Sequence, residues 1–150
     1  MHRTLICLPT LLLLIAGCGL ATRRVDVRLT EGIFPPRPPG AEVELWVGET
    51  DRPKIPIAVI SSSRTAERSA EAREAQVEEL RERARSLGAH AVENLRVETA
   101  EVNGFVADPR TPFTAFKQGE FDLHFVRGTA VYYLTDEEIA AREALGISAP

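Results

Sequence analysis

Few side chains in this sequence have the type and spacing that catalysis or metal binding needs. A metal site requires several nitrogen, oxygen or sulfur ligands that converge on one point. His90 follows a predicted helix and His124 lies on the polar side of a predicted strand, so only a tertiary contact could bring them together. Serines 61–63 lack the glycines of a nucleophile elbow, and helix capping explains them. We therefore expect no catalytic residue, no metal, no cofactor and no enzymatic activity.

Cys18 has a different kind of chemistry available. A short basic start (residues 1–3) precedes an apolar run over residues 5–15. That run is shorter than the ~20 residues that a transmembrane helix needs, and its order is that of a secretory signal. The sequence IAGC (residues 15–18) at its end resembles the bacterial lipobox. The resemblance implies cleavage between Gly17 and Cys18 and acylation of the Cys18 thiol.

A plain signal peptide, or a short anchor that happens to contain cysteine, is the alternative. Acyl chains on Cys18 would hold the protein on a bilayer, since two hydrophobic signals already give stable anchoring. Gly19 stands where some sorting signals have aspartate, which resembles lipoproteins of the outer membrane that face the periplasm. Because Cys7 would leave with the signal, no free thiol would remain, and disulfides, a cysteine nucleophile and thiolate zinc sites are excluded.

Length and charge limit the domain organisation and the partners. With 150 residues, 44% of them hydrophobic and 27% charged, the chain has room for one globular domain. Its net charge of −4 argues against nucleic acid as a partner, because lysine and arginine supply much of that affinity. Four prolines within residues 34–40 predict an extended tether. We expect a signal peptide (1–17), a lipidated tether (18–40), a domain (41–134) and a C-terminal helix and tail (135–150).

Hydrophobic periodicity predicts a small α+β fold, β-β-α-β-β, with one long helix on a mostly antiparallel sheet. A stretch rich in alanine, glutamate and arginine predicts the long helix, which Gly88 would close. Thr135 and Glu138 form a capping box for a short last helix. Turn residues predict a long connection over 101–119. The expected elements are strands at 41–48, 54–61, 89–100 and 120–134, the long helix at 66–87, and the short helix at 135–145.

The same patterns predict which residues face the core. The strand at 54–61 is apolar throughout, which predicts burial on both faces. Because one helix covers one face of a sheet, the other face would be covered by the 101–119 connection with the last helix, or by another subunit. The other predicted core residues are Val43, Leu45, Val47, Leu95 and Val97 on strands, and Ala66, Ala70, Val77, Leu80, Ala84 and Leu87 on the long helix.

Two short segments carry a resemblance to a known family. The sequences LGAHAVENLRVE (87–98) and VRGTAVYY (126–133) are similar to the small bacterial YbjQ-like domains and to the related RcsF-like envelope lipoproteins. The likeness covers roughly residues 43–134. It implies an α+β lipoprotein domain, and it implies a homo-oligomer, since YbjQ-like domains are known as oligomers.

Exposed aromatic residues are the strongest candidates for an interaction surface. They are Trp46, Phe105, Phe113, Phe116, Tyr132 and Tyr133, although the phenylalanines could instead fold back over the core. We expect a non-enzymatic, lipid-anchored protein that contacts another envelope protein in envelope maintenance or stress sensing. The alternative is a module that binds a small molecule or metal in the cleft between helix and sheet.

The lipobox yields the first prediction. Cys18→Ala removes the thiol that would be acylated, so the protein should move from the membrane fraction to the soluble fraction or remain as unprocessed precursor. Immunoblotting of separated membrane and soluble fractions measures this. A Cys7→Ala variant is the control and should fractionate as the wild type does. Unchanged membrane fractionation and processing of the Cys18→Ala protein would contradict the lipobox.

Overall fold

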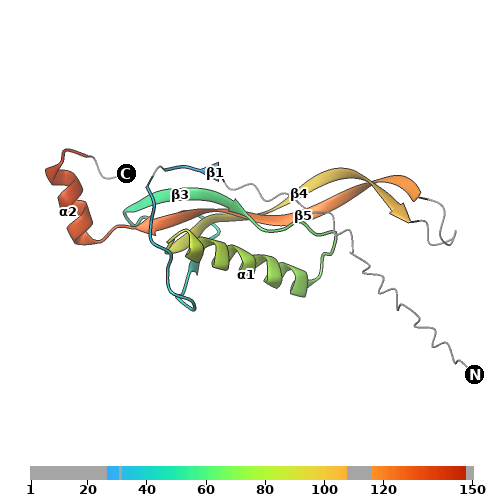
Figure 1. Cartoon of the computed structure of the whole chain (residues 1–150), viewed down its shortest axis with the longest axis horizontal. Helices are drawn as coiled ribbons and strands as arrows, with labels where there is room; N and C mark the ends of the chain where they lie inside the picture. Colours follow the sequence, from blue (N-terminus) through green and yellow to red (C-terminus); the bar gives the residue numbers. More distant parts are fainter. Residues whose placement is uncertain (1–26, 31, 108–115, 148–150) are drawn as a thin grey trace, which may run out of the picture.

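The computed structural model describes residues 27–30, 32–107 and 116–147, and the side chains of 105–118 are outside this description. One five-stranded sheet and two helices account for the regular structure of these residues (Figure 1). The elements are β1 (Val27–Arg28), β2 (Glu44–Leu45), β3 (Lys54–Ser61), α1 (Ala70–Ser86), β4 (Ala91–Ala107), β5 (Phe116–Tyr133) and α2 (Asp136–Ala144).

The predicted α+β class is confirmed. The strands lie in the order β1-β3-β5-β4-β2, and every neighbouring pair is antiparallel except β2 with β4. Figure 1 shows α1 against one face of this sheet and α2 beyond the end of β5. The capping box of α2 is formed by Thr135 and Glu138, as the sequence predicts. None of the described helices is long and apolar enough to cross a membrane.

Helix α1 begins later than the predicted residue 66 because the preceding segment is hydrogen-bonded to β5. The Ser62 amide donates to the Val126 carbonyl (2.9 Å), and Thr65 and His124 exchange backbone hydrogen bonds. The chain can turn into a helix only after these contacts, so the N-cap is Ser69, whose hydroxyl accepts from the Ala72 amide (3.1 Å). The expectation that serines 61–63 cap the helix is therefore wrong.

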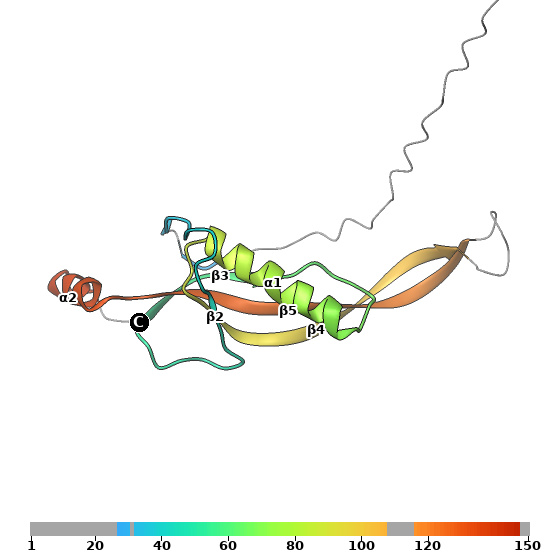
Figure 2. The same cartoon turned by 90° about the horizontal axis from the view of Figure 1, so that it is seen from below.

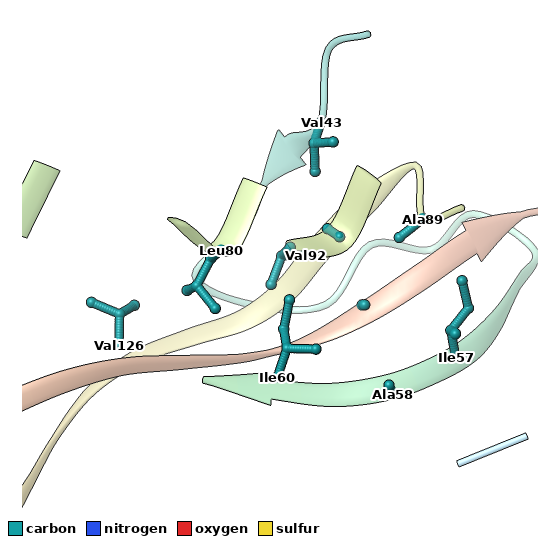
Figure 3. Packing of buried hydrophobic residues seen from close by; sticks show 10 residues of the cluster. Val43, Ile57, Ala58, Ile60, Leu80, Ala89, Val92 and Val126 are labelled. Atoms are coloured by element: carbon teal, nitrogen blue, oxygen red, sulfur yellow. The ribbon is translucent and has the colours of Figure 1, made fainter. Parts of the chain in front are cut away.

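The core lies between α1 and the sheet (Figure 3). Leu80 and Ala84 on the helix are fully buried, whereas Ala66 and Ala70 at the predicted start of the stripe are exposed. A buried polar residue, Gln76, takes part as well, and its side-chain amide donates to two backbone carbonyls, of Ser63 (3.0 Å) and His124 (2.8 Å). These bonds fix the helix to β5 and satisfy the buried amide.

Residues 101–119 do not form the expected connection. Residues 101–107 extend β4 and residues 116–119 begin β5, in register from Ala107 with Phe116. Two of the turn signals, Asn103-Gly104 and Gln118-Gly119, lie within the paired strands, where Gly104 is opposite Gly119. The third, Asp108-Pro109, falls outside the described residues.

β3 ends opposite Arg127, and only residues 62–65 continue beside β5, as far as His124. The ribbon of residues 97–107 and 116–126, which we call the arm, is therefore two-stranded beyond His124 and projects past α1 (Figure 2).

Residues 27–30 and 32–40 do not form a free tether, since they contact the sheet and α1 before residue 41, where the domain is expected to begin. Val27 pairs with Val59, and the Phe34 ring stacks on Tyr132 with centroids 4.6 Å apart. Gly88 ends α1 at φ +81°, and an added Cβ there would lie 2.7 Å from Phe34 Cβ and from the Pro35 carbonyl oxygen. The proline-rich segment is therefore packed on the end of the helix.

Three valines that the sequence predicts in the core, Val47, Val59 and Val97, are not fully buried. In each case the apolar pattern of the sequence continues beyond the elements that could cover it. β2 ends at Leu45, so Val47 is 85% exposed. No described helix lies over the outer face of β3, so Val59 is only partly buried. A bulge between Glu93 and Arg96 and the end of the five-stranded region leave Val97 exposed, although Leu95 packs against the core.

A tight contact at Gly128 gives the second prediction. A Cβ at this position would lie 2.5 Å from Val92 Cγ1 and 3.0 Å from the Glu93 carbonyl oxygen, so the sheet must shift to accept it. Gly128→Ala should lower the free energy of unfolding by about 1–3 kcal/mol in chemical denaturation. Gly48→Ala is the control, because nothing lies within 4 Å of a Cβ there. Equal stability of the two variants would show that the sheet is looser than described.

Candidate protein-binding groove

A groove of about 650 Å³ lies near the point where β2 and β4 begin and β5 ends. Its wall combines aromatic rings with paired charges. The residues that line it are Arg37, Glu42, Glu44, Leu45, Trp46, Arg52, His90 and Tyr133.

The aromatic wall is organised by His90. Its Nδ1 accepts a hydrogen bond from the Tyr133 amide (3.1 Å), and its ring stacks on Tyr132 with centroids 4.5 Å apart. Burial, followed by the nearby charge of Arg37, lowers the pKa of His90. The ring is therefore a neutral aromatic surface at neutral pH, with Nε2 carrying the proton.

The charged wall is organised by Glu44. Its carboxylate accepts from Arg52 Nη1 (2.9 Å) and from Trp46 Nε1 (3.0 Å). The hydrogen bond from Arg52, followed by that from Trp46, lowers the pKa of Glu44. The Arg52 guanidinium also lies 4.8 Å from the centroid of the Tyr133 ring, a cation–π distance. One carboxylate thus fixes the orientation of the tryptophan and of one arginine.

Arg37 closes the other side of the groove. Its Nη1 donates to the carbonyl oxygen of Glu42 (2.6 Å), and its own amide donates to the carbonyl oxygen of Arg85 at the end of α1 (2.9 Å). The proline-rich segment therefore supplies a side chain to the wall of the groove.

The loop that carries Trp46 and Arg52 is held by a buried carboxylate. Glu93 is 1% exposed and accepts from Lys54 Nζ, from the Thr50 hydroxyl (2.5 Å) and from the Thr50 amide (3.2 Å). Burial would raise the pKa of Glu93, but the hydrogen bonds from Lys54 and Thr50 outweigh it and lower the pKa. The ionised carboxylate thus fixes the loop over the sheet.

The structure brings together two of the six predicted interaction residues. Trp46 and Tyr133 line the groove, whereas Tyr132 faces away and donates from its hydroxyl to Glu138 (3.0 Å). Phe105 and Phe116 lie on β4 and β5, with side chains outside the described atoms. Phe113, the Gly17–Cys18 cleavage site and the Cys18 lipidation site also fall outside the described residues.

The residues considered for catalysis or metal binding have structural partners. His124 Nδ1 contacts the Thr99 hydroxyl (2.9 Å), and its Nε2 accepts from Arg68 (2.7 Å). The Ser63 hydroxyl donates to Glu79 (2.6 Å), and the Ser62 hydroxyl accepts from the Val126 amide. Among the described residues, no group of three or more His, Cys, Asp or Glu side chains could hold a metal ion.

Most of the groove has no signature in the sequence. Arg37, Glu44 and Arg52 line it, and charged residues outside regular motifs are usually solvated. Glu93 does not line the groove but holds the loop beside it. The one available signal was Glu93, a charge inside an otherwise small and apolar strand start, which predicts a buried partner. The chain matches no protein-family model, no curated protein and no solved structure.

The third prediction concerns the buried ion pair. Lys54→Met leaves the Glu93 carboxylate buried without its charge partner, which should lower the free energy of unfolding by about 3 kcal/mol. The control is Arg52→Met, which breaks the exposed pair with Glu44 and should cost about 0–1 kcal/mol. Urea denaturation at neutral pH measures both. Similar values for the two variants would contradict the role of Glu93 in holding the loop.

Proposed function

We propose that this chain is a lipid-anchored protein of the bacterial envelope that binds a segment of another envelope protein in the groove around Trp46 and Tyr133. It carries out no reaction of its own and acts in envelope maintenance or stress sensing. The lipobox sequence and the resemblance to YbjQ-like and RcsF-like lipoproteins support the location.

One observation carries the binding role, and it is the composition of the groove. Tryptophan, tyrosine and arginine are the residue types most enriched at the energetic centres of protein interfaces, and Trp46, Tyr133 and Arg52 meet here. Trp46 is the only tryptophan of the chain and is 42% exposed. Each of these side chains is already oriented by a hydrogen bond or ring contact, so a partner would pay little ordering entropy.

The charges of the groove favour a peptide partner. Glu42 and Glu44 balance Arg37 and Arg52 in formal charge, so the groove has no excess of either sign. A strongly acidic or basic ligand would find no complementary surface. A polypeptide segment with an apolar side chain between polar groups matches the aromatic centre and the charged rim.

The fourth prediction tests this role by crosslinking in the native envelope, followed by mass spectrometry. Trp46→Ala should remove the crosslinked partner, because loss of an interface centre costs about 2 kcal/mol or more, roughly 30-fold in affinity. Val97→Ala is the control, since Val97 is similarly exposed (46%) but does not line the groove, and should keep the partner.

Two outcomes would count against a protein partner. Retention of the same crosslinks in Trp46→Ala would exclude the groove as the binding surface. A bound small molecule in native mass spectrometry, lost in Trp46→Ala, would instead favour the small-molecule module, for which a groove of about 650 Å³ is large enough.

A further inference from the structure

The sheet face opposite α1 has no helix over it in the described chain (Figure 1). Ala58 and Ala130 are paired and point to the core, so Val59 and its partner Thr129 point to the opposite face. Val27 is paired with Val59 and extends this face to the edge of the sheet, where it is 47% exposed. We call this surface, with the shallow hollow of about 270 Å³ beside Val47, the open face.

The arm continues the open face with apolar residues. Ala100 is opposite Leu123 and Val102 is opposite Phe121, and these four share a side of the ribbon because directly opposed residues do. Beyond the paired Val97 and Val126, the other side of the arm is polar. It carries Thr99, Glu101, Asn103, Asp122 and His124, and it is the side that α1 and its preceding segment contact.

The charges on the open face are mainly positive, although the chain as a whole is acidic. Arg96 and Arg127 are paired across the sheet, and the Arg64 guanidinium lies over Phe125 (5.1 Å). One carboxylate on this face, Glu98, is shared by Arg96 (2.6 Å) and Arg127 (3.6 Å).

Two further acids lie on or near the open face: Glu93, which is buried and paired with Lys54, and, on the adjoining loop, Glu49. Its carboxylate accepts a hydrogen bond from the side-chain amide of Asn94 (2.9 Å). Because Glu93 and Lys54 neutralise each other, the three arginines on this face stand against two other carboxylates, those of Glu98 and Glu49.

The length of chain before β1 determines which surface is near the anchor. Val27 is nine residues after Cys18, and a fully extended chain covers at most ~3.3–3.6 Å per residue. An acylated Cys18 would therefore keep the outer edge of the open face within about 30 Å of the bilayer. An apolar surface with surplus arginines at that distance matches an anionic phospholipid surface in both chemistry and position.

We propose that the open face, including the apolar side of the arm, lies on the anionic phospholipid bilayer to which Cys18 is attached. This inference rests on the lipid anchor of the proposed function and adds the orientation of the domain. α1 and the polar side of the arm then face away from the membrane.

The test is the fifth prediction and uses the full acylated chain in vesicles of phosphatidylcholine with or without phosphatidylglycerol. The proposed mature chain has no free thiol, so one introduced cysteine can carry a bimane fluorophore. Val47→Cys and Val102→Cys probe the open face, and Glu82→Cys on α1 and Glu101→Cys on the polar side of the arm are matched controls. Brominated acyl chains should quench the first two labels and leave the controls unquenched.

The lipid charge supplies a second readout. Arg96→Gln should reduce the ratio of membrane-facing to free orientations about fivefold in vesicles with phosphatidylglycerol, since one arginine near an anionic surface contributes about that factor. Arg73→Gln on the exposed side of α1 is the control and should change nothing.

The outcomes separate the two proposals. Failure of the acylated chain to float with vesicles overturns the anchor and this inference together. Flotation with equal quenching on both sides, or with none, overturns the orientation alone. Crosslinking between two Val47→Cys chains, without quenching, would assign the open face to a second copy and would also overturn it.

Discussion

The carboxylate of Glu93 is the constraint on which the groove depends. It lies on the open face of the sheet, where no helix covers it, and its ionised form persists because Lys54 and Thr50 replace the water that it loses. Those two partners are on or next to the 46–53 loop. Holding Glu93 therefore also holds the segment that presents Trp46 and Arg52.

A local backbone feature beside Glu93 has the same effect. Asn94 adopts φ +54°, and its amide donates to the carbonyl oxygen of Gly48 (3.1 Å). The Leu95 amide donates to the carbonyl oxygen of Trp46 (3.0 Å), so the loop runs beside β4 across the bulge. The bulge interrupts the regular ladder and lets the crossover from β2 to β3 pack on the sheet. The charge network and the bulge together give the groove a fixed wall without a second helix.

The unequal cover of the two faces explains the shape of the whole domain. α1 supplies one apolar stripe, which is enough for one face of a sheet but not for two. The arm leaves the five-stranded region and beyond His124 has only its own two strands, and an isolated ribbon of this kind is marginally stable in water. A surface that covers its apolar side would stabilise it, and the proposed membrane orientation assigns that cover to the bilayer.

The sequence by itself determined the class of fold and the order of its main elements. The signals were local: the alternation of apolar residues, the helix-forming composition, the capping box at Thr135 and the helix end at Gly88. Each of them depends on the conformational preferences of neighbouring residues alone. Only the tertiary structure decided that residues 27–30 and 32–40 belong to the domain, that 101–107 and 116–119 extend two strands, and that four distant side chains share a groove. These side chains are Arg37, Trp46, Arg52 and Tyr133. Those outcomes depend on contacts between residues far apart in the chain, such as Phe34 with Tyr132 and Lys54 with Glu93, and no local pattern encodes which distant partner a side chain meets.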